Sequence, residues 1–393
     1  MHIDDICFLD TETKTRVPGG DVTVDGTYRY MKNAHVIIKT YAIGNEPVAC
    51  IAPIDAYETG LEERDMPIDL LRFRDRVAAG KAKFAAWNAG FDRQAVATID
   101  DGFAIGPTSF IDIMAQAVAS NLPASLEGAA RFIGRNGKHP DGKALIKTFC
   151  TYGMAATPWT HPVQWATFLD YGITDTDLLR DIFRHTRPLS DDEWLEYWAS
   201  ETINDRGMAV DIRLCEAASA IADADRARTN ELLNRFTNGQ ITSVHQHQRI
   251  ADWLWDALEY SEARAILVSK FDEDVDADEG SGGLVATKLS AERDRVTRLI
   301  AFMQAKAPLS ERDETILRVL QLREFGASST PKKFDKVLAQ HVDGAVFGQY
   351  VFNGANQTGR FSAKGVQVHN LTRSTLGARE AEAIELICSL QED

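Results

Sequence analysis

The chain has 393 residues, of which 44% are hydrophobic and 26% charged, so it is long enough for two or three domains and has the composition of an ordinary globular protein. No apolar run is long enough to cross a bilayer and no basic leader precedes the first apolar run, which excludes a membrane segment and predicts a cytoplasmic protein. The net charge of −15 excludes a uniformly basic nucleic-acid-binding surface, although a local basic groove can coexist with an acidic exterior.

The first predicted element is a buried strand over the apolar residues 6–9. Asp10 and Glu12 follow it, and because side chains alternate along a strand, the two carboxylates project from the same side of the strand end. Both can therefore reach one cation. Taken alone, an Asp-x-Glu sequence is more typical of a solvated strand end.

A second strand is predicted over residues 83–87, followed by a turn at residues 88–90 and a helical stretch through residues 93–97. Asp92 then lies near a helix start beside the strand ends, where it can approach a second metal through water. Asn88 and Asp92 are also ordinary turn and cap residues, so this motif alone does not distinguish a site from a turn.

Tyr171 and Asp175 stand four residues apart in a helical pattern that continues to Ile182, which places the phenol and the carboxylate on one face. In that arrangement Asp175 closes a metal site, and the Tyr171 hydroxyl orients an attacking water. For this pair alone, a core aromatic beside a surface acid is the simpler interpretation.

The three acidic motifs together supply four carboxylates, enough to hold two divalent metals. Two such ions can activate a water for attack on one side of a phosphodiester and stabilise the leaving oxygen on the other. Oxygen ligands suit magnesium-type ions, and no Cys/His cluster indicates zinc. The five cysteines are scattered and lack a Cys-x-x-Cys pair, which predicts reduced thiols. The sequence therefore predicts a nuclease.

This constellation resembles the DnaQ-like DEDD 3′-to-5′ exonucleases, in the branch that carries tyrosine in the third motif, because Asp170 stands where the other branch has histidine. The resemblance implies that residues 1–189 form an α/β domain of ribonuclease H-like type, with a mixed sheet flanked by helices. Residues 112–114 and 125–126 also resemble the middle region of that family. The resemblance further implies Tyr171 as the residue that positions the water, and two Mg²⁺ or Mn²⁺ ions bound by Asp10, Glu12, Asp92 and Asp175.

A helical region is predicted after a boundary near residues 187–192, where Ser190 and Glu193 form a Ser-x-x-Glu capping box. Its tryptophan-bearing helix faces favour core packing over base stacking. An acidic stretch at residues 271–283 has the composition of a mobile loop and lacks the spacing of an EF-hand calcium site. The predicted helices cover residues 193–204, 211–236, 244–258, 291–305 and 310–324.

A second signature occupies residues 354–362 and 367–371, and a basic stretch with Lys332, Lys333 and Lys336 precedes it. The signature resembles the Thr-Gly-Arg-Leu-Ser-Ser…Gln-Asn-Ile-Pro segment of family A DNA polymerases, which lies where thumb meets palm and touches the primer-template duplex. Two residues depart from the family pattern: His369, where the family has glutamine, and Thr372, where it has proline. Without the family, the segment is a polar loop leading into a strand, and the lysines form either phosphate contacts or an exposed helix start. The residues matched to this segment are Thr358, Arg360, His369 and Asn370.

Donors such as Arg360 and Asn370 can test base-pair geometry in the minor groove without reading sequence, which suits a copying enzyme. The resemblance implies a thumb over residues 190–345 and the start of a palm over residues 346–393. No candidate palm strand with a metal-binding aspartate, fingers helix or His-Asp-Glu-type strand follows Leu371. We therefore expect the proofreading portion of a phage or bacterial family A polymerase, which acts on a DNA 3′ end and does not polymerise alone.

Two alternatives stay open at this point. One is a noncatalytic primer-template-binding subunit that serves a separate chain carrying palm and fingers. The other is an RNA 3′-exonuclease that uses the same carboxylates.

Overall fold

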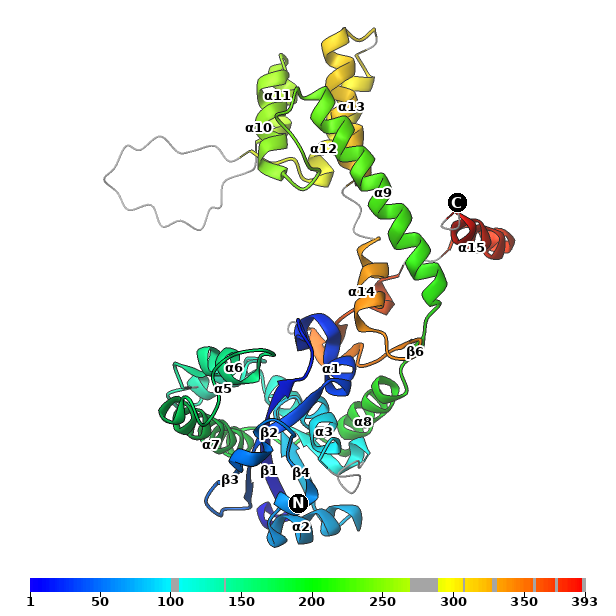
Figure 1. Cartoon of the computed structure of the whole chain (residues 1–393). Coiled ribbons are helices and arrows are strands. Elements are labelled where there is room, and N and C mark those ends of the chain that lie inside the picture. The colour runs from blue at the N-terminus through cyan, green and yellow to red at the C-terminus, as the bar shows by residue number, and fades with distance from the viewer. Residues whose placement is uncertain are drawn as a thin grey trace. The chain divides into compact units, whose positions relative to one another are not determined.

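The computed structural model describes most of the chain, namely residues 1–99, 106–137, 139–268, 289–306, 308–326, 331–355, 358–371 and 374–390. Its internal contacts divide the chain into two compact units, whose elements are labelled in Figure 1. The first unit contains Met1–Ile212 and Lys336–Arg373, and the second contains Arg213–Asp335 and Ser374–Asp393. The predicted division at residues 189 and 345 stays a prediction, and the acidic stretch at 271–283 falls outside the described residues.

A mixed sheet forms the centre of the first unit, as expected, and its five strands have the order β3-β2-β1-β4-β5. Strand β1 pairs antiparallel with β2 and parallel with β4. The outer pairs are antiparallel between β2 and β3 and parallel between β4 and β5. The strands are β1 (Ile6–Thr15), β2 (Ala34–Ile43), β3 (Ala49–Ile51), β4 (Lys83–Ala86) and β5 (Phe110–Asp112).

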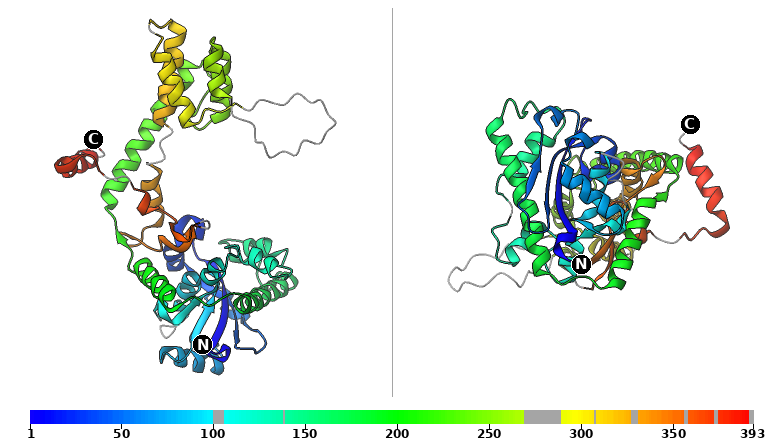
Figure 2. Two further views of the ribbon diagram at one scale, coloured as in Figure 1. Left: turned by 180° about the vertical axis from the view of Figure 1, so that it is seen from behind. Right: turned by 90° about the horizontal axis from the view of Figure 1, so that it is seen from below.

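Helices cover both faces of this sheet, and a view from below shows the strands between them (Figure 2). The long helix α7 lies against one face, and α2 and α3 lie against the other. Helix α1 is interrupted at Gly26, whose φ of 72° and ψ of 159° are not helical. The helices in the Met1–Ile212 segment of the first unit are α1 (Val22–Lys32), α2 (Ile68–Ala78), α3 (Ala89–Ala97), α4 (Ile113–Ala119), α5 (Leu126–Phe132), α6 (Gly142–Cys150), α7 (Pro162–His185) and α8 (Asp191–Arg206).

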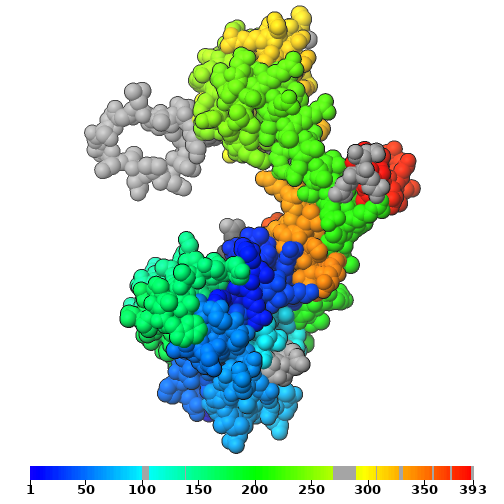
Figure 3. Space-filling model, viewed as in Figure 1, coloured from blue at the N-terminus to red at the C-terminus, as the bar shows by residue number. Residues whose placement is uncertain are grey.

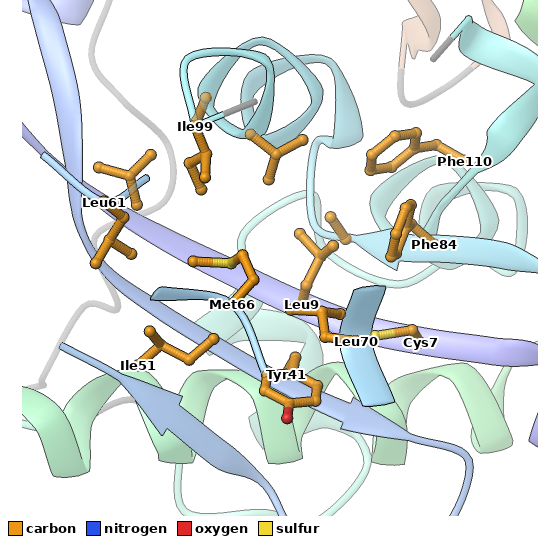
Figure 4. Packing of buried hydrophobic residues seen from close by; sticks show 14 of the residues in the cluster. Cys7, Leu9, Tyr41, Ile51, Leu61, Met66, Leu70, Phe84, Ile99 and Phe110 are labelled. Carbon is orange, nitrogen blue, oxygen red and sulfur yellow. The ribbon is translucent and has the colours of Figure 1, made fainter. Parts of the chain in front are cut away.

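The alternation of side chains along β1 builds a core on each face of the sheet. Cys7 and Leu9 pack into the cluster shared with α2 and α3, where Figure 4 shows them beside Leu70 and Phe84. The even-numbered residues of the same strand, such as Phe8, pack on the other face with residues of α4, α5 and α7. Since apolar residues project from both faces, the strand can be buried only between two helical layers.

The later part of the first unit contains two small two-stranded sheets. One pairs β6 (Met208–Ala209) with β7 (Ala345–Val346), and the other pairs β8 (Tyr350–Ala355) with β9 (Arg360–Ala363). Helix α8 begins with the predicted capping box, in which the Glu193 amide donates to the Ser190 hydroxyl and the Ser190 amide donates to the Glu193 carboxylate.

The second unit is helical within its described residues, and the predicted helices at 211–236, 244–258, 291–305 and 310–324 are confirmed with small shifts at their ends. Its core is one apolar cluster that includes Leu254, Leu299 and Val319. Among the described helices of the whole chain, none combines the length and apolar character that a bilayer crossing requires. The five cysteines, all within the described residues, form no disulfide bond. The helices are α9 (Ile212–Phe236), α10 (His247–Ala257), α11 (Ser261–Leu267), α12 (Arg293–Gln304), α13 (Glu311–Gly326) and α15 (Glu380–Ser389), with α14 (Lys332–Gln340) across the boundary between the units.

Candidate active site

The first acidic motif lies within β1 and not at its end, which corrects the sequence prediction. The strand continues to Thr15 because its antiparallel pairing with β2 continues past Asp10 and Glu12. Its pairing with β4 ends earlier, at Phe8 opposite Ala85. The two acids therefore lie on the part of β1 that still pairs with β2 but no longer with β4. Both are half-buried and alternate with buried threonines, so they share one face as predicted.

The second motif follows β4 as predicted, and helix α3 begins at Ala89. Asn88 adopts the left-handed conformation, with φ 56° and ψ 57°, which turns the chain sharply between strand and helix. Asp92 is only 3% exposed and accepts a hydrogen bond of 2.7 Å from the Thr11 hydroxyl of β1. Burial, and after it the charge of Asp10, raise the pKa of Asp92 well above its ordinary value.

The third motif lies on α7, and its two functional side chains are buried there. The Tyr171 hydroxyl is hydrogen-bonded to the Asp175 carboxylate. Burial raises the pKa of Tyr171 far above its ordinary value, and the charges of Glu12, Asp175 and Asp10 add to this effect. The phenol is therefore protonated at neutral pH, where it can donate a hydrogen bond.

Close packing against β2 fixes the position of this part of α7. The Thr40 hydroxyl donates to the Gly172 carbonyl at 3.1 Å and lies 2.7 Å from the Thr176 hydroxyl. A Cβ on Gly172 would lie 3.2 Å from the Thr40 methyl group, and one on Gly142 of α6 would lie 2.5 Å from the Tyr171 ring. Two glycines thus allow the third motif to approach the strand and α6, a role that the sequence analysis missed.

Electrostatic effects connect the three motifs, yet their side chains do not form a preformed metal cage. Within the described residues there is no group of three or more His, Cys, Asp or Glu side chains spaced to hold an ion. Two of the carboxylates accept hydrogen bonds from hydroxyl groups, Asp92 from Thr11 and Asp175 from Tyr171. The predicted sharing of ligands between two ions stays a prediction.

Asp112, at the head of α4, supports the second motif through its buried carboxylate. It accepts hydrogen bonds from the backbone amides of Asn88 and Ala89, each at 3.2 Å. It also accepts from the Tyr197 hydroxyl at 2.9 Å and caps its own helix. Burial raises the pKa of Asp112 to about 6. From the sequence, residues 112–114 could be related only to a family segment. The supporting role of Asp112 was missed, because its partners are distant along the chain and leave no local sequence pattern.

Arg93, the neighbour of Asp92, anchors α3 to α8. Its guanidinium donates to both carboxylate oxygens of Asp205, at 2.6 and 2.9 Å, and to Glu201 at 3.1 Å. The Arg93 side chain is only 6% exposed, so these contacts are protected from solvent. Tyr28 of α1 also donates to Asp205. A buried bidentate pair of this kind fixes orientation as well as distance, so three helices meet at the second motif.

The second sequence signature forms the β8–β9 hairpin and the turn that follows. Thr358 and Arg360 are exposed on the hairpin, and the ring of His369 stacks on Tyr350 with centroids 6.3 Å apart. Asn370 is exposed in a short helical turn at Val368–Asn370. The matching positions 356–357 and 372 fall outside the described residues.

The side chain of Asn204 ties this hairpin to α8. Its amide group donates to the Tyr350 carbonyl and its oxygen accepts from the Tyr350 amide, both at 2.9 Å. The hairpin is therefore connected through α8 to Glu201, and from there to Arg93.

The predicted basic stretch begins α14, where Lys332 is exposed and Lys333 is half-buried. A helix begins at Lys332, as one of the two alternatives for this stretch expects, and phosphate contacts stay a prediction. Residues 328–330 fall outside the part of the chain that is described. Lys332 and Lys333 belong to the second unit, whereas the acidic motifs belong to the first.

Comparison with known proteins identifies a relative of the whole chain. No protein-family model matches. The chain is 26% identical over 409 aligned residues to a DNA polymerase of Bacillus phage SP02, across 96% of this chain and 54% of that protein. The chain is similar to a phage DNA polymerase. It spans about half the length of this curated relative.

A comparison of structures finds the polymerase domain of Pol1 from M. smegmatis, solved in complex with DNA primer-template and dNTP. The TM-score is 0.48 and the identity 13%, over 94% of this chain and 53% of that chain. A TM-score of 0.48 is too low to establish a shared fold.

Proposed function

We propose that the chain carries the 3′-to-5′ exonuclease of a DNA polymerase and hydrolyses the 3′-terminal phosphodiester of DNA. The observation that carries this proposal is that hydrogen bonds join three acidic motifs that lie far apart in the sequence. Thr11, between Asp10 and Glu12, donates to Asp92, and Thr40, which pairs with Asp10, donates to the Gly172 carbonyl beside Tyr171. Asp10 acts on the pKa of Asp92, and carboxylates of the first and third motifs act on the pKa of Tyr171. Similarity to a phage DNA polymerase supports the polymerase context.

The donor set fits two hard divalent cations, because every candidate ligand is a carboxylate oxygen. The raised pKa of Asp92 supports this assignment, since a buried acid that repels its neighbour gains most from a bound cation. Bound Mg²⁺ or Mn²⁺ would activate a water and stabilise the leaving oxygen. The residues that would hold the ions are Asp10, Glu12, Asp92 and Asp175.

The chain's own residues orient the reacting groups. The protonated Tyr171 hydroxyl would hold the attacking water in line with the scissile bond. Thr11 holds Asp92 at the edge of β1, and Thr40 holds α7 against β2, so two threonines fix the motifs relative to the strand. A site fixed in this way loses little entropy when the substrate reacts.

The fold and the duplex contacts are part of the same proposal. We infer a ribonuclease H-like exonuclease domain over residues 1–189, a thumb over 190–345 and the start of a palm over 346–393, supported by the mixed sheet order of the first unit. The exposure of Thr358 and Arg360 on the β8–β9 hairpin, and of Lys332, supports contacts with a primer-template duplex. The residues proposed for these contacts are Asn88, Lys332, Lys333, Thr358, Arg360, His369 and Asn370.

The direct test is degradation of 5′-labelled single-stranded DNA by the purified chain with Mg²⁺. We expect stepwise shortening from the 3′ end, abolished by chelation and by Asp10→Asn. The matched control is Asp55→Asn, which removes an exposed acid from the same unit and should leave the rate unchanged. An Asp10→Asn variant that degrades DNA as fast as the wild type would contradict the proposal.

A noncatalytic primer-template-binding subunit is the second candidate, favoured by the exposure of Thr358, Arg360 and Asn370. Tight duplex binding without any cleavage, together with copurification of a chain that carries palm and fingers, would support it. An RNA oligonucleotide degraded faster than its DNA counterpart would instead indicate an RNA exonuclease.

A further inference from the structure

The first unit contains a cavity of about 380 Å³ beside the second acidic motif, here called the α1 cavity. Its volume lies in the range of small-ligand sites. Helix α1 forms one wall, and residues after Lys336 form the other; in the space-filling view the dark-blue residues of α1 lie against orange residues of that later segment (Figure 3). The lining residues used below are Tyr28, Asn88, Phe91, Lys336, Phe347 and Lys364.

The residues that line the α1 cavity carry a net positive charge, whereas the chain as a whole is acidic; Asp21 and Asp205 lie outside the lining but interact with Lys336 and Tyr28. Fourteen described residues line it, and they include two lysines and no aspartate or glutamate. The chain has 58 acidic residues among 393, so an average set of fourteen would contain about two. A cavity of this composition favours an anionic ligand.

One of the two lysines is held in place by backbone groups. The Lys336 ammonium donates to the carbonyls of Thr23 and Val24, both at 3.2 Å, which fixes it beside the first turn of α1. Because an ammonium group has three N–H donors, one more remains for a ligand. Lys364 lines the cavity from the segment after β9 and is exposed.

Aromatic rings give the same cavity flat apolar surfaces. Tyr28 stacks on Phe347 with ring centroids 5.1 Å apart and an interplanar angle of 24°. A Cβ on Gly348 would lie 3.0 Å from the Tyr28 ring, so a glycine there allows the close approach of chain and ring. Rings beside cationic groups are the combination that binds single-stranded nucleic acid, with bases stacked and phosphates neutralised.

We propose that the α1 cavity binds one nucleotide of a single DNA strand, with its phosphate between Lys336 and Lys364 and its base against the aromatic lining. The choice of a DNA strand rests on the proposed function, because Phe91 in the cavity wall directly precedes Asp92 of the acidic site. The strand would then pass from the cavity to the acidic motifs, so that the cavity holds a nucleotide upstream of the 3′ end.

The test measures binding apart from cleavage, by fluorescence anisotropy of a labelled single-stranded DNA with the full chain in chelator. We expect Lys364→Gln to weaken binding about 5-fold and to reduce the salt dependence of log K by about 0.7, the effect of one lost phosphate contact. Lys336→Gln should act similarly. The matched control is Lys81→Gln, an exposed lysine of the same unit outside the cavity, which should bind as the wild type does.

A second measurement locates the base directly. Oligonucleotides with one 5-iodouracil at successive positions from the 3′ end are irradiated with the protein, and the crosslinked peptide is identified by mass spectrometry. We expect crosslinks to Tyr28, Phe91 or Phe347 from an upstream position. The proposal is overturned if Lys364→Gln binds as Lys81→Gln does, or if every crosslink maps outside the cavity. A chain that binds in this way but degrades no DNA would contradict the exonuclease and leave the cavity assignment standing.

Discussion

Replacement of Lys39 by methionine should make the first unit more stable at neutral pH and remove a pH dependence of its stability. Lys39 lies on β2 with no solvent exposure, and burial lowers its pKa to about 8 from 10.5. The charges of Cys7 and Asp92 act in the opposite direction. A shift of about 2.5 pKa units corresponds to about 3 kcal/mol.

The sign follows from proton binding in the two states. Below pH 8 both the folded and the unfolded chain hold the proton on Lys39, so the folded state bears the whole cost of the buried charge. Between pH 8 and 10.5 the folded state has lost the proton while the unfolded state retains it, so stability rises with pH in this window. The stability of wild type minus that of Lys39→Met should therefore increase by about 3 kcal/mol from pH 7.5 to 10.5.

The assay must report on the first unit alone. Burial raises the pKa of Cys7 to about 12, so this thiol at the centre of β1 reacts only when the unit unfolds. Pulsed thiol labelling in a urea series, read on the Cys7 peptide by mass spectrometry, gives the free energy of unfolding at each pH. Lys81→Met, at an exposed lysine, is the control without this pH effect. A wild-type minus Lys39→Met difference that stays within about 0.5 kcal/mol over the window would refute the reasoning.

Three further changes test the site. Tyr171→Phe should lower the exonuclease rate at least about tenfold without unfolding the chain, because it removes only the hydroxyl that would orient the water; circular dichroism checks the fold. Gly172→Ala should shift α7 away from Thr40 and lower the exonuclease rate. Its effect on stability should be small, because a gain of about 1 kcal/mol in helix propensity offsets the cost of the tighter packing. The control is Gly106→Ala, where a Cβ meets open space, and it should change neither the rate nor the stability. Asp112→Ala should speed amide hydrogen exchange in the turn before α3 and reduce the rate about tenfold, whereas unchanged exchange would contradict its supporting role.

The sequence predicts the elements that carry the acidic motifs because local patterns decide them. An apolar run marks the start of β1, a polar turn separates β4 from α3, and helical spacing puts Tyr171 and Asp175 on one face of α7. The capping box at Ser190 gives the first turn of α8 within one residue.

Features that depend on pairing across the fold were missed. The sequence placed a strand end at Asp10, because the residues from Thr11 to Thr15 are polar, yet pairing with β2 continues the strand. Lys39 would be assigned to the surface by its charge, and only the packing of β2 between helical layers shows it to be buried. The support of the turn at Asn88 by Asp112 likewise needs the spatial neighbourhood of β4 and β5.

The side chain of Asn204 forms hydrogen bonds with both polar backbone groups of Tyr350. In a sheet, the backbone of an adjoining strand would make these two bonds. The polar main-chain groups of Tyr350 are thereby satisfied by a side chain of α8. This link is chemically vulnerable. Hydrolysis of the amide to aspartate would remove the donor to the Tyr350 carbonyl and put a second negative charge beside Glu201, which would weaken the link between the hairpin and α8.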